Sequence, residues 1–72
     1  MSEEYQLVHF LDSDGSNEQG LLKHVDKESN VGYVIFGEIC MNNPNHSTAV
    51  PVDLDSLYIR ENVNLIPLKT KI

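Results

Sequence analysis

The chain has 72 residues, with eleven Asp and Glu against five Lys and Arg, for a net charge of −6. This length allows one domain, residues 1–72, whose core lies near the lower size limit for independent folding. The single cysteine, Cys40, excludes a disulfide within the chain, and no apolar stretch approaches the roughly 20 residues of a membrane-spanning helix.

The first 30 residues predict two short strands separated by polar turns. Tyr5–Leu11 is aromatic and branched, which is typical of a strand. It ends at Asp12–Asn17, where Asp and Asn bond their own backbone and Gly accepts positive φ. Gly20–Val25 predicts the second strand, and the polar segment Asp26–Asn30 predicts the turn that closes it.

Val31–Met41 predicts the third and central strand. It is apolar on both alternating sets of residues, as expected for a strand covered on both faces. We therefore expect Val34, Ile35 and Phe36 to be among the most buried residues. Gly37 predicts a bend or bulge within this strand, the device that lets one strand serve both sides of a curled sheet.

The segment after Met41 begins with a loop. Asn42–Ser47 consists entirely of turn-forming or polar residues. Thr48–Val52 then predicts a fourth short strand. Because Pro51 cannot donate a hydrogen bond to a ladder, we expect this strand at an edge of the sheet.

Residues 53–58 allow two interpretations. In the first, Asp53 or Asp55 caps a single helical turn. In the second, Leu57–Arg60 forms a strand that pairs with Val63–Leu68 across a tight turn. The sequence leaves both open.

Together these patterns predict a mainly β fold. Five to six short strands at spacings of about ten residues are typical of a small single-domain curled antiparallel sheet or barrel, here with at most one or two helical turns. A short turn of helix before the last strand is similar to the layout of SH3-like and Sm-like small barrels. That resemblance concerns layout, and a fold of this kind does not fix a function.

The residues that bind metals do not occur at the spacing of a metal site. Asp12–Asn17 begins like a calcium loop, but the sixth and twelfth places from Asp12 hold Asn17 and Lys23 in place of Gly and an acid. The remaining ligand types are scattered along the chain: His9, His24, Cys40 and His46. We therefore expect a turn at this position, with no metal and no cofactor.

Catalytic residues are also missing from the pattern. Cys40 ends an apolar run, where a thiol is usually an inert small hydrophobe. His9 alternates with Leu7 and Leu11, which places its side chain at the margin of the core. No nucleophile motif, phosphate-binding loop or dinucleotide motif occurs, and so small a fold leaves little room for a pocket. We expect no enzyme activity.

The acids gather in the N-terminal part of the chain. Residues 1–30 hold seven acids and two bases, whereas residues 31–72 hold four acids and three bases. We predict a non-enzymatic interaction protein (adaptor, accessory factor or inhibitor) that binds a larger, basic protein through an acidic face and an edge strand. The acids expected to contact this partner lie in two turns: Asp12, Asp14, Glu18, Asp26 and Glu28.

Other interpretations stay open. A nucleic-acid-binding small barrel is disfavoured, because five scattered bases under a charge of −6 repel phosphates. A structural subunit could instead complete a homo-oligomer through its β edges, and acids could serve solubility alone. Since no secretion signal opens the chain and its one thiol suits a reducing compartment, we expect a cytoplasmic location without a membrane partner.

Overall fold

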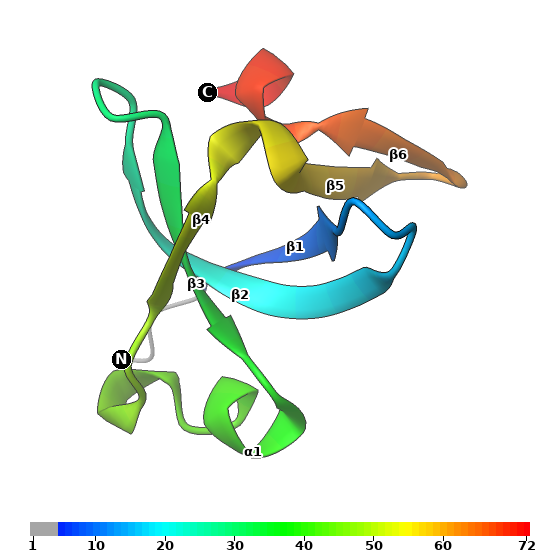
Figure 1. The fold of residues 1–72 in the computed structure, drawn as a ribbon. Coiled ribbons are helices and arrows are strands. Elements are labelled where there is room, and N and C mark those ends of the chain that lie inside the picture. Colours follow the sequence, from blue (N-terminus) through cyan, green and yellow to red (C-terminus); the bar gives the residue numbers. More distant parts are fainter. Residues whose placement is uncertain (1–4) are drawn as a thin grey trace.

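The computed structural model describes residues 5–72, which form one six-stranded antiparallel sheet (Figure 1). The strands are β1 (Gln6–Leu11), β2 (Asn17–Asp26), β3 (Val31–Phe36), β4 (Val50–Asp53), β5 (Leu57–Glu61) and β6 (Asn64–Pro67). The helical segments of these residues are single turns: α1 (Glu38–Met41), η1 (Pro44–His46), η2 (Leu54–Ser56) and η3 (Leu68–Lys71). The mainly β fold is confirmed, although four helical turns occur where the sequence predicts one or two.

The strands lie in the order β4-β3-β2-β1-β5-β6. The first four form a meander, η2 follows β4, and β5 then returns to pair with β1. In Figure 1 the sheet curls, so that β5 and β6 lie above β1 with the β2–β3 hairpin rising to their left, while α1 lies at the bottom. Within residues 5–72, β4 and β6 are not paired with each other, so the structure is a curled sheet rather than a closed barrel.

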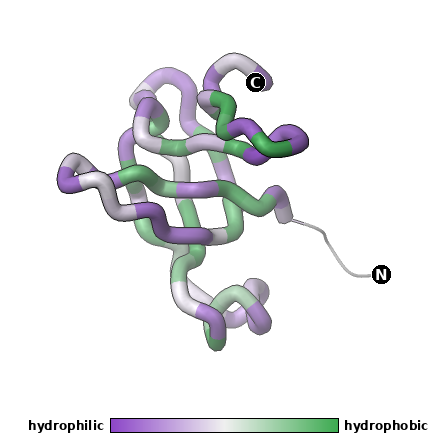
Figure 2. The backbone as a smooth tube through the Cα atoms, turned by 90° about the vertical axis from the view of Figure 1, so that its right-hand side faces the viewer, coloured by the Kyte–Doolittle hydropathy of each residue, from purple (hydrophilic) through white to green (hydrophobic). Residues whose placement is uncertain are grey.

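The core fills the inner face of this curl. Figure 2 shows hydrophobic and hydrophilic residues alternating along the strands, the pattern of a sheet with one apolar face. Gly32 lies on this inner face, where a Cβ would meet Leu57 Cδ1 at 2.6 Å and Leu54 Cδ1 at 3.2 Å. A glycine there lets η2 and the start of β5 pack directly against β3. The buried cluster consists of Val8, Val34, Leu54, Leu57 and Leu68.

The prediction of a strand over Val31–Met41 is wrong in its second half. The strand ends at Phe36, and Gly37 follows with φ at 92°, a conformation that takes the chain out of the ladder. The residues beyond it form α1, which projects from the sheet. Ile39 is therefore 80% exposed, and Cys40 is exposed rather than packed at the end of a strand.

The burial expected at the centre of β3 is found for two of three residues. Val34 and Ile35 have no exposed surface. Phe36 is only partly buried, because it is the last residue of the strand. Its ring contacts Phe10 edge-to-face, with ring centroids 5.9 Å apart.

The two interpretations of residues 53–58 both hold, in succession. Asp53 Oδ1 accepts a hydrogen bond from the backbone N–H of Asp55 at 3.0 Å and so caps η2. Immediately afterwards β5 begins and pairs with β6. β4 lies at the edge of the sheet, as Pro51 predicts.

His9 does not lie at the margin of the core. Only 2% of it is exposed, and β1 lies between β2 and β5. Its register partners are Gln19 and Tyr58, and its Nδ1 lies 3.4 Å from Asn17 Oδ1. The sequence does not reveal that β5 returns to cover β1, so the burial of His9 could not be predicted.

Candidate functional site

The five acids predicted to contact a partner fall into two groups at opposite ends of β2. Figure 1 shows the β1–β2 turn and the β2–β3 turn at these two ends. The first group comprises Asp12, Asp14 and Glu18, and the second comprises Asp26 and Glu28. The sheet does not bring the five acids together into one patch.

The β1–β2 turn is built from its own residues. Asp12 Oδ1 accepts the N–H of Ser13 at 2.7 Å, and the Asp12 carbonyl accepts the N–H of Gly15 at 3.0 Å. Asp14 Oδ1 accepts the N–H of Ser16 at 2.9 Å. Hydrogen bonding from Ser16 holds the pKa of Asp14 below its ordinary value. Asp12 and Asp14 therefore stabilise the turn itself, and these bonds do not connect it to a distant segment.

The β2–β3 end also contains Asp53, which the sequence did not indicate as a partner contact. Asp26 pairs in register with Val31, and Val31 pairs on its other side with Asp53 of β4. Residues in register share a face of a sheet, so the two carboxylates lie on one face with Val31 between them. Neighbouring strands are about 4.8 Å apart, which places the two aspartates about 10 Å apart.

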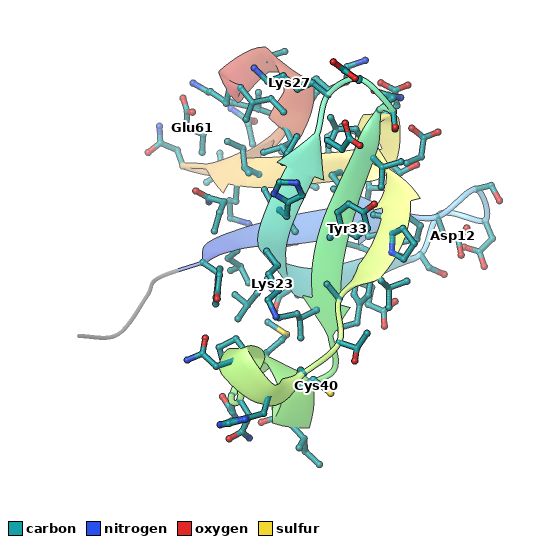
Figure 3. All side chains as sticks on the ribbon, turned by 90° about the vertical axis from the view of Figure 1, so that its left-hand side faces the viewer. Asp12, Lys23, Lys27, Tyr33, Cys40 and Glu61 are labelled. Carbon is teal, nitrogen blue, oxygen red and sulfur yellow. The ribbon has the colours of Figure 1, made fainter. Side chains whose placement is uncertain are left out.

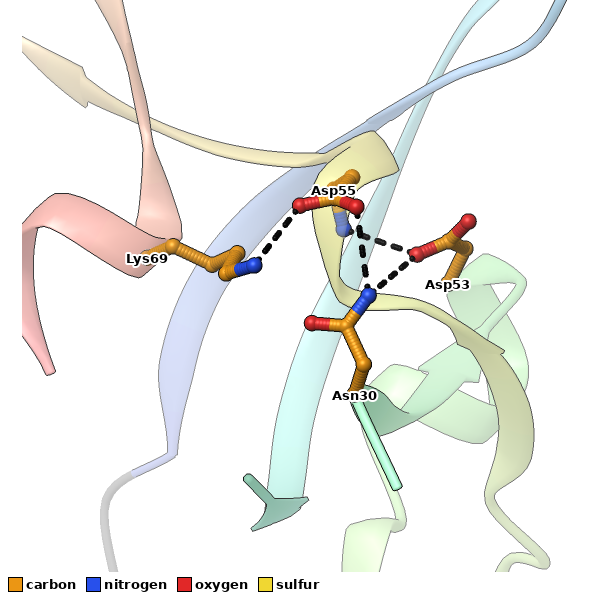
Figure 4. Close-up of polar contacts among 4 residues, drawn as sticks. All are labelled: Asn30, Asp53, Asp55 and Lys69. Carbon is orange, nitrogen blue, oxygen red and sulfur yellow. Dashed lines mark hydrogen bonds and ion pairs between the residues drawn. The ribbon is translucent and has the colours of Figure 1, made fainter. Parts of the chain in front are cut away.

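A polar network joins three segments at this same end (Figure 4). Asn30 Nδ2 donates to Asp53 Oδ1 at 3.0 Å and to Asp55 Oδ2 at 3.2 Å. Lys69 Nζ lies 3.0 Å from Asp55 Oδ1. Lys69 and then Asn30 hold the pKa of Asp55 below its ordinary value. The network thus fastens the β2–β3 turn, η2 and η3 to one another.

Three of the five bases are held by partners other than the predicted acids. Lys69 pairs with Asp55, and Lys71 Nζ lies 2.8 Å from Glu61 Oε2. Lys23 Nζ donates to the carbonyls of residues 44 and 47 at 3.4 and 3.3 Å. Among the described residues, none of the five predicted acids takes part in an ion pair.

A hollow of about 570 Å³ opens on the outer face of the sheet, beside the β2–β3 end. The β2 register shifts between Leu22 and His24, which sets His24 opposite Tyr33. Their rings stack with centroids 5.8 Å apart and planes inclined by 30°. Figure 3 views this face, with Tyr33 and Lys23 on it and Asp12 away at the β1–β2 turn. The lining residues are Tyr5, Lys23, His24, Asp26, Tyr33 and Ala49.

A second hollow, of about 430 Å³, lies between the start of β2 and α1. Glu18 and Glu38 both line it, together with Met41. It is acidic like the first group of acids, but no aromatic side chain lines it. The first hollow, called the aromatic hollow below, differs from it because it offers both the flat rings of His24 and Tyr33 and the carboxylate of Asp26.

Neither a metal centre nor a relative gives an independent indication of function. Residues 5–72 contain no group of three or more His, Cys, Asp or Glu arranged to hold a metal ion. No helix in that part of the chain is long and apolar enough to cross a membrane. Comparisons with protein-family models, with curated proteins and with solved structures found no match.

Proposed function

We propose that this chain is a non-enzymatic interaction protein that binds a larger protein with a basic surface, as an adaptor, accessory factor or inhibitor. The observation that carries the proposal is that, within residues 5–72, the five predicted acids form no ion pairs while three of the five bases are held elsewhere. Uncompensated carboxylates at both ends of β2 produce a negative field that steers a basic partner towards the sheet.

The acidic surface supports this proposal better than the edge strands do. β4 and β6 are the edges, and each has four residues. Pro51 lies within β4, and Pro67 ends β6. Short edges that contain proline resist the addition of another strand. The same property disfavours a homo-oligomer joined edge to edge.

The charge distribution also disfavours the remaining alternative, a nucleic-acid-binding protein. A nucleic acid would meet a surface on which Lys69 and Lys71 already pair with acids. A cytoplasmic location belongs to the proposal as well. Cys40 is a free, exposed thiol, which suits a reducing compartment.

Capture of proteins from a cell lysate tests the proposal. We compare the wild-type chain with two pairs of neutralising substitutions, Asp12→Asn with Asp14→Asn and Asp26→Asn with Glu28→Gln. Val63→Lys with Asn64→Lys is the control, because it changes the net charge equally at exposed sites at the β5–β6 turn, outside both acidic turns. We expect basic proteins to be captured, and at least one acidic pair to reduce capture several-fold at low salt. Equal capture by all variants would leave the acids with a role in solubility alone.

A further inference from the structure

We propose that the aromatic hollow on the outer face of β2 and β3 is the docking site for an extended, arginine-bearing segment of a protein partner. This inference rests on the proposed function, since it specifies where and how a basic partner binds. The site lies at the β2–β3 end of the sheet and leaves the acids of the β1–β2 turn outside the contact.

The register builds the site from two rows of side chains. One row crosses the sheet at Tyr33, which has His24 on one side and Pro51 on the other. The adjacent row, two residues along β3, crosses at Val31 and has an aspartate on each side. Two residues along a strand span about 6.6 Å. The face therefore presents an apolar, aromatic row beside an acidic row.

The two carboxylates of the acidic row have bonding capacity left. Asp26 uses Oδ1 to accept the N–H of Ser29, and Asp53 uses Oδ1 to accept from Asn30 and Asp55. Within residues 5–72 no donor reaches Oδ2 of either residue. A guanidinium is the side chain that both pairs with carboxylates and stacks on an aromatic face. Arginine is therefore the occupant that this pair of rows fits best.

Lys23 gives the site a direction. It lines the hollow three residues before Asp26, and its Nζ donates to the carbonyls of Pro44 and Ser47 at 3.4 and 3.3 Å. A partner's basic side chain is repelled at this end and attracted at the Asp26 end. The bound segment therefore places its arginine beside Asp26 and an uncharged residue towards Lys23.

Peptide binding followed by NMR tests the site. The probe is a short fluorescent peptide in which arginine and leucine alternate, and its partner probe carries citrulline, which is neutral, in place of arginine. We expect the arginine peptide to shift the amide signals of residues 24–26, 31–33, 52 and 53, and the citrulline peptide to bind about tenfold more weakly. Asp26→Asn and Tyr33→Ala should each weaken binding about five- to tenfold. The control, Glu38→Gln, removes the same charge at an exposed position of α1 and should leave binding unchanged.

Several outcomes would overturn the site. Equal binding of the two peptides, no binding of either, or no effect of Asp26→Asn each contradicts it. Shifts confined to the β1–β2 turn, together with weakening by Asp14→Asn, contradict the site but leave the proposed function intact. If single-stranded DNA binds more tightly than the peptide and shifts the same amides, the partner is a nucleic acid and both proposals are wrong. Should Tyr33→Ala lose its dispersed spectrum, His24→Ala, at an exposed position, replaces it.

Discussion

The turns at the two ends of β2 contain the same types of turn-forming residue, Asp and Asn, but the side chains hydrogen-bond to different partners. At the β1–β2 end, Asp12 and Asp14 bond backbone groups one or two residues away. At the β2–β3 end, Asn30 bonds side chains that lie 23 and 25 residues further along the chain. Local hydrogen bonds shape a loop, whereas bonds between distant segments also fix how the sheet closes over its core.

This difference decides where a defined docking surface can form. The β1–β2 turn holds its acids on a loop tip, where they add charge without a shaped surface. The β2–β3 end holds Asp26 beside two packed strands and the stacked rings of His24 and Tyr33. Both ends contribute to the field around the protein, but the second end is better suited to recognise the shape of a partner.

The largest expected effect comes from the core beneath the β2–β3 end. Leu54 is 1% exposed, and its backbone N–H bonds the Asn30 carbonyl at 3.0 Å. Leu54→Ala should lower the free energy of unfolding by about 2–5 kcal/mol through lost burial and a new cavity, as urea denaturation would measure. The control is Val63→Ala at the exposed β5–β6 turn, which should change it by less than about 0.5 kcal/mol. A small loss for Leu54→Ala would mean that η2 is not packed as described.

Substitution of two glycines tests the comparison between the two ends with smaller expected losses of stability. Gly32→Ala should cost about 1–3 kcal/mol, because the new methyl group meets two buried leucines. Gly15→Ala should cost about 1 kcal/mol, since nothing lies within 4 Å and the cost comes from its φ of 92°. Thermal denaturation of both variants measures the difference. A larger loss for Gly15 than for Gly32 would reverse the ranking of the two ends.

The smallest effect is a dependence on pH. The pKa of Asp55 is lowered from the ordinary 3.8 in the folded protein, so its contribution to stability is present above that value and lost as the pH falls through the folded pKa. Asp55→Asn should therefore flatten the fall in melting temperature on acidification, and added salt should do the same by screening Lys69. Asp14→Asn should flatten it less, because the bond to Ser16 joins close neighbours that can also meet in the unfolded chain. Identical profiles for Asp55→Asn and the wild type would show that the Lys69 pair does not contribute.

The parts of the fold that depend on local chemistry could be predicted from the sequence. The turn at Asp12 follows from its Asp, Gly and Asn content, and the edge position of β4 follows from Pro51. The sequence also offers Asp53 or Asp55 as the cap of a helical turn, and the structure has Asp53. Each of these depends on the backbone of one residue or its near neighbours. Such preferences depend only on a short stretch of neighbouring residues.

The parts that depend on distant contacts could not be predicted. Ile39 and Cys40 are apolar enough for a strand, and a short apolar run does not distinguish a strand from a helical turn. The approach of Asp53 to Asp26 requires the pairing of β3 with β4 in one register. The contacts of Asn30 could not be predicted either. Asn is favoured at a positive φ such as the 59° found here, but the partners of its side chain lie far along the chain.

The return of β5 to β1 also has a consequence for the order of folding. Each of the other strand pairings joins consecutive strands, whereas this one unites residues 9 and 58 and residues 10 and 57. Closing so long a loop costs more chain entropy than forming a hairpin, and its reward comes only when Leu57 reaches the core. We therefore expect the meander and the β5–β6 hairpin to form first, and their joining along β1 to be the slowest step in folding.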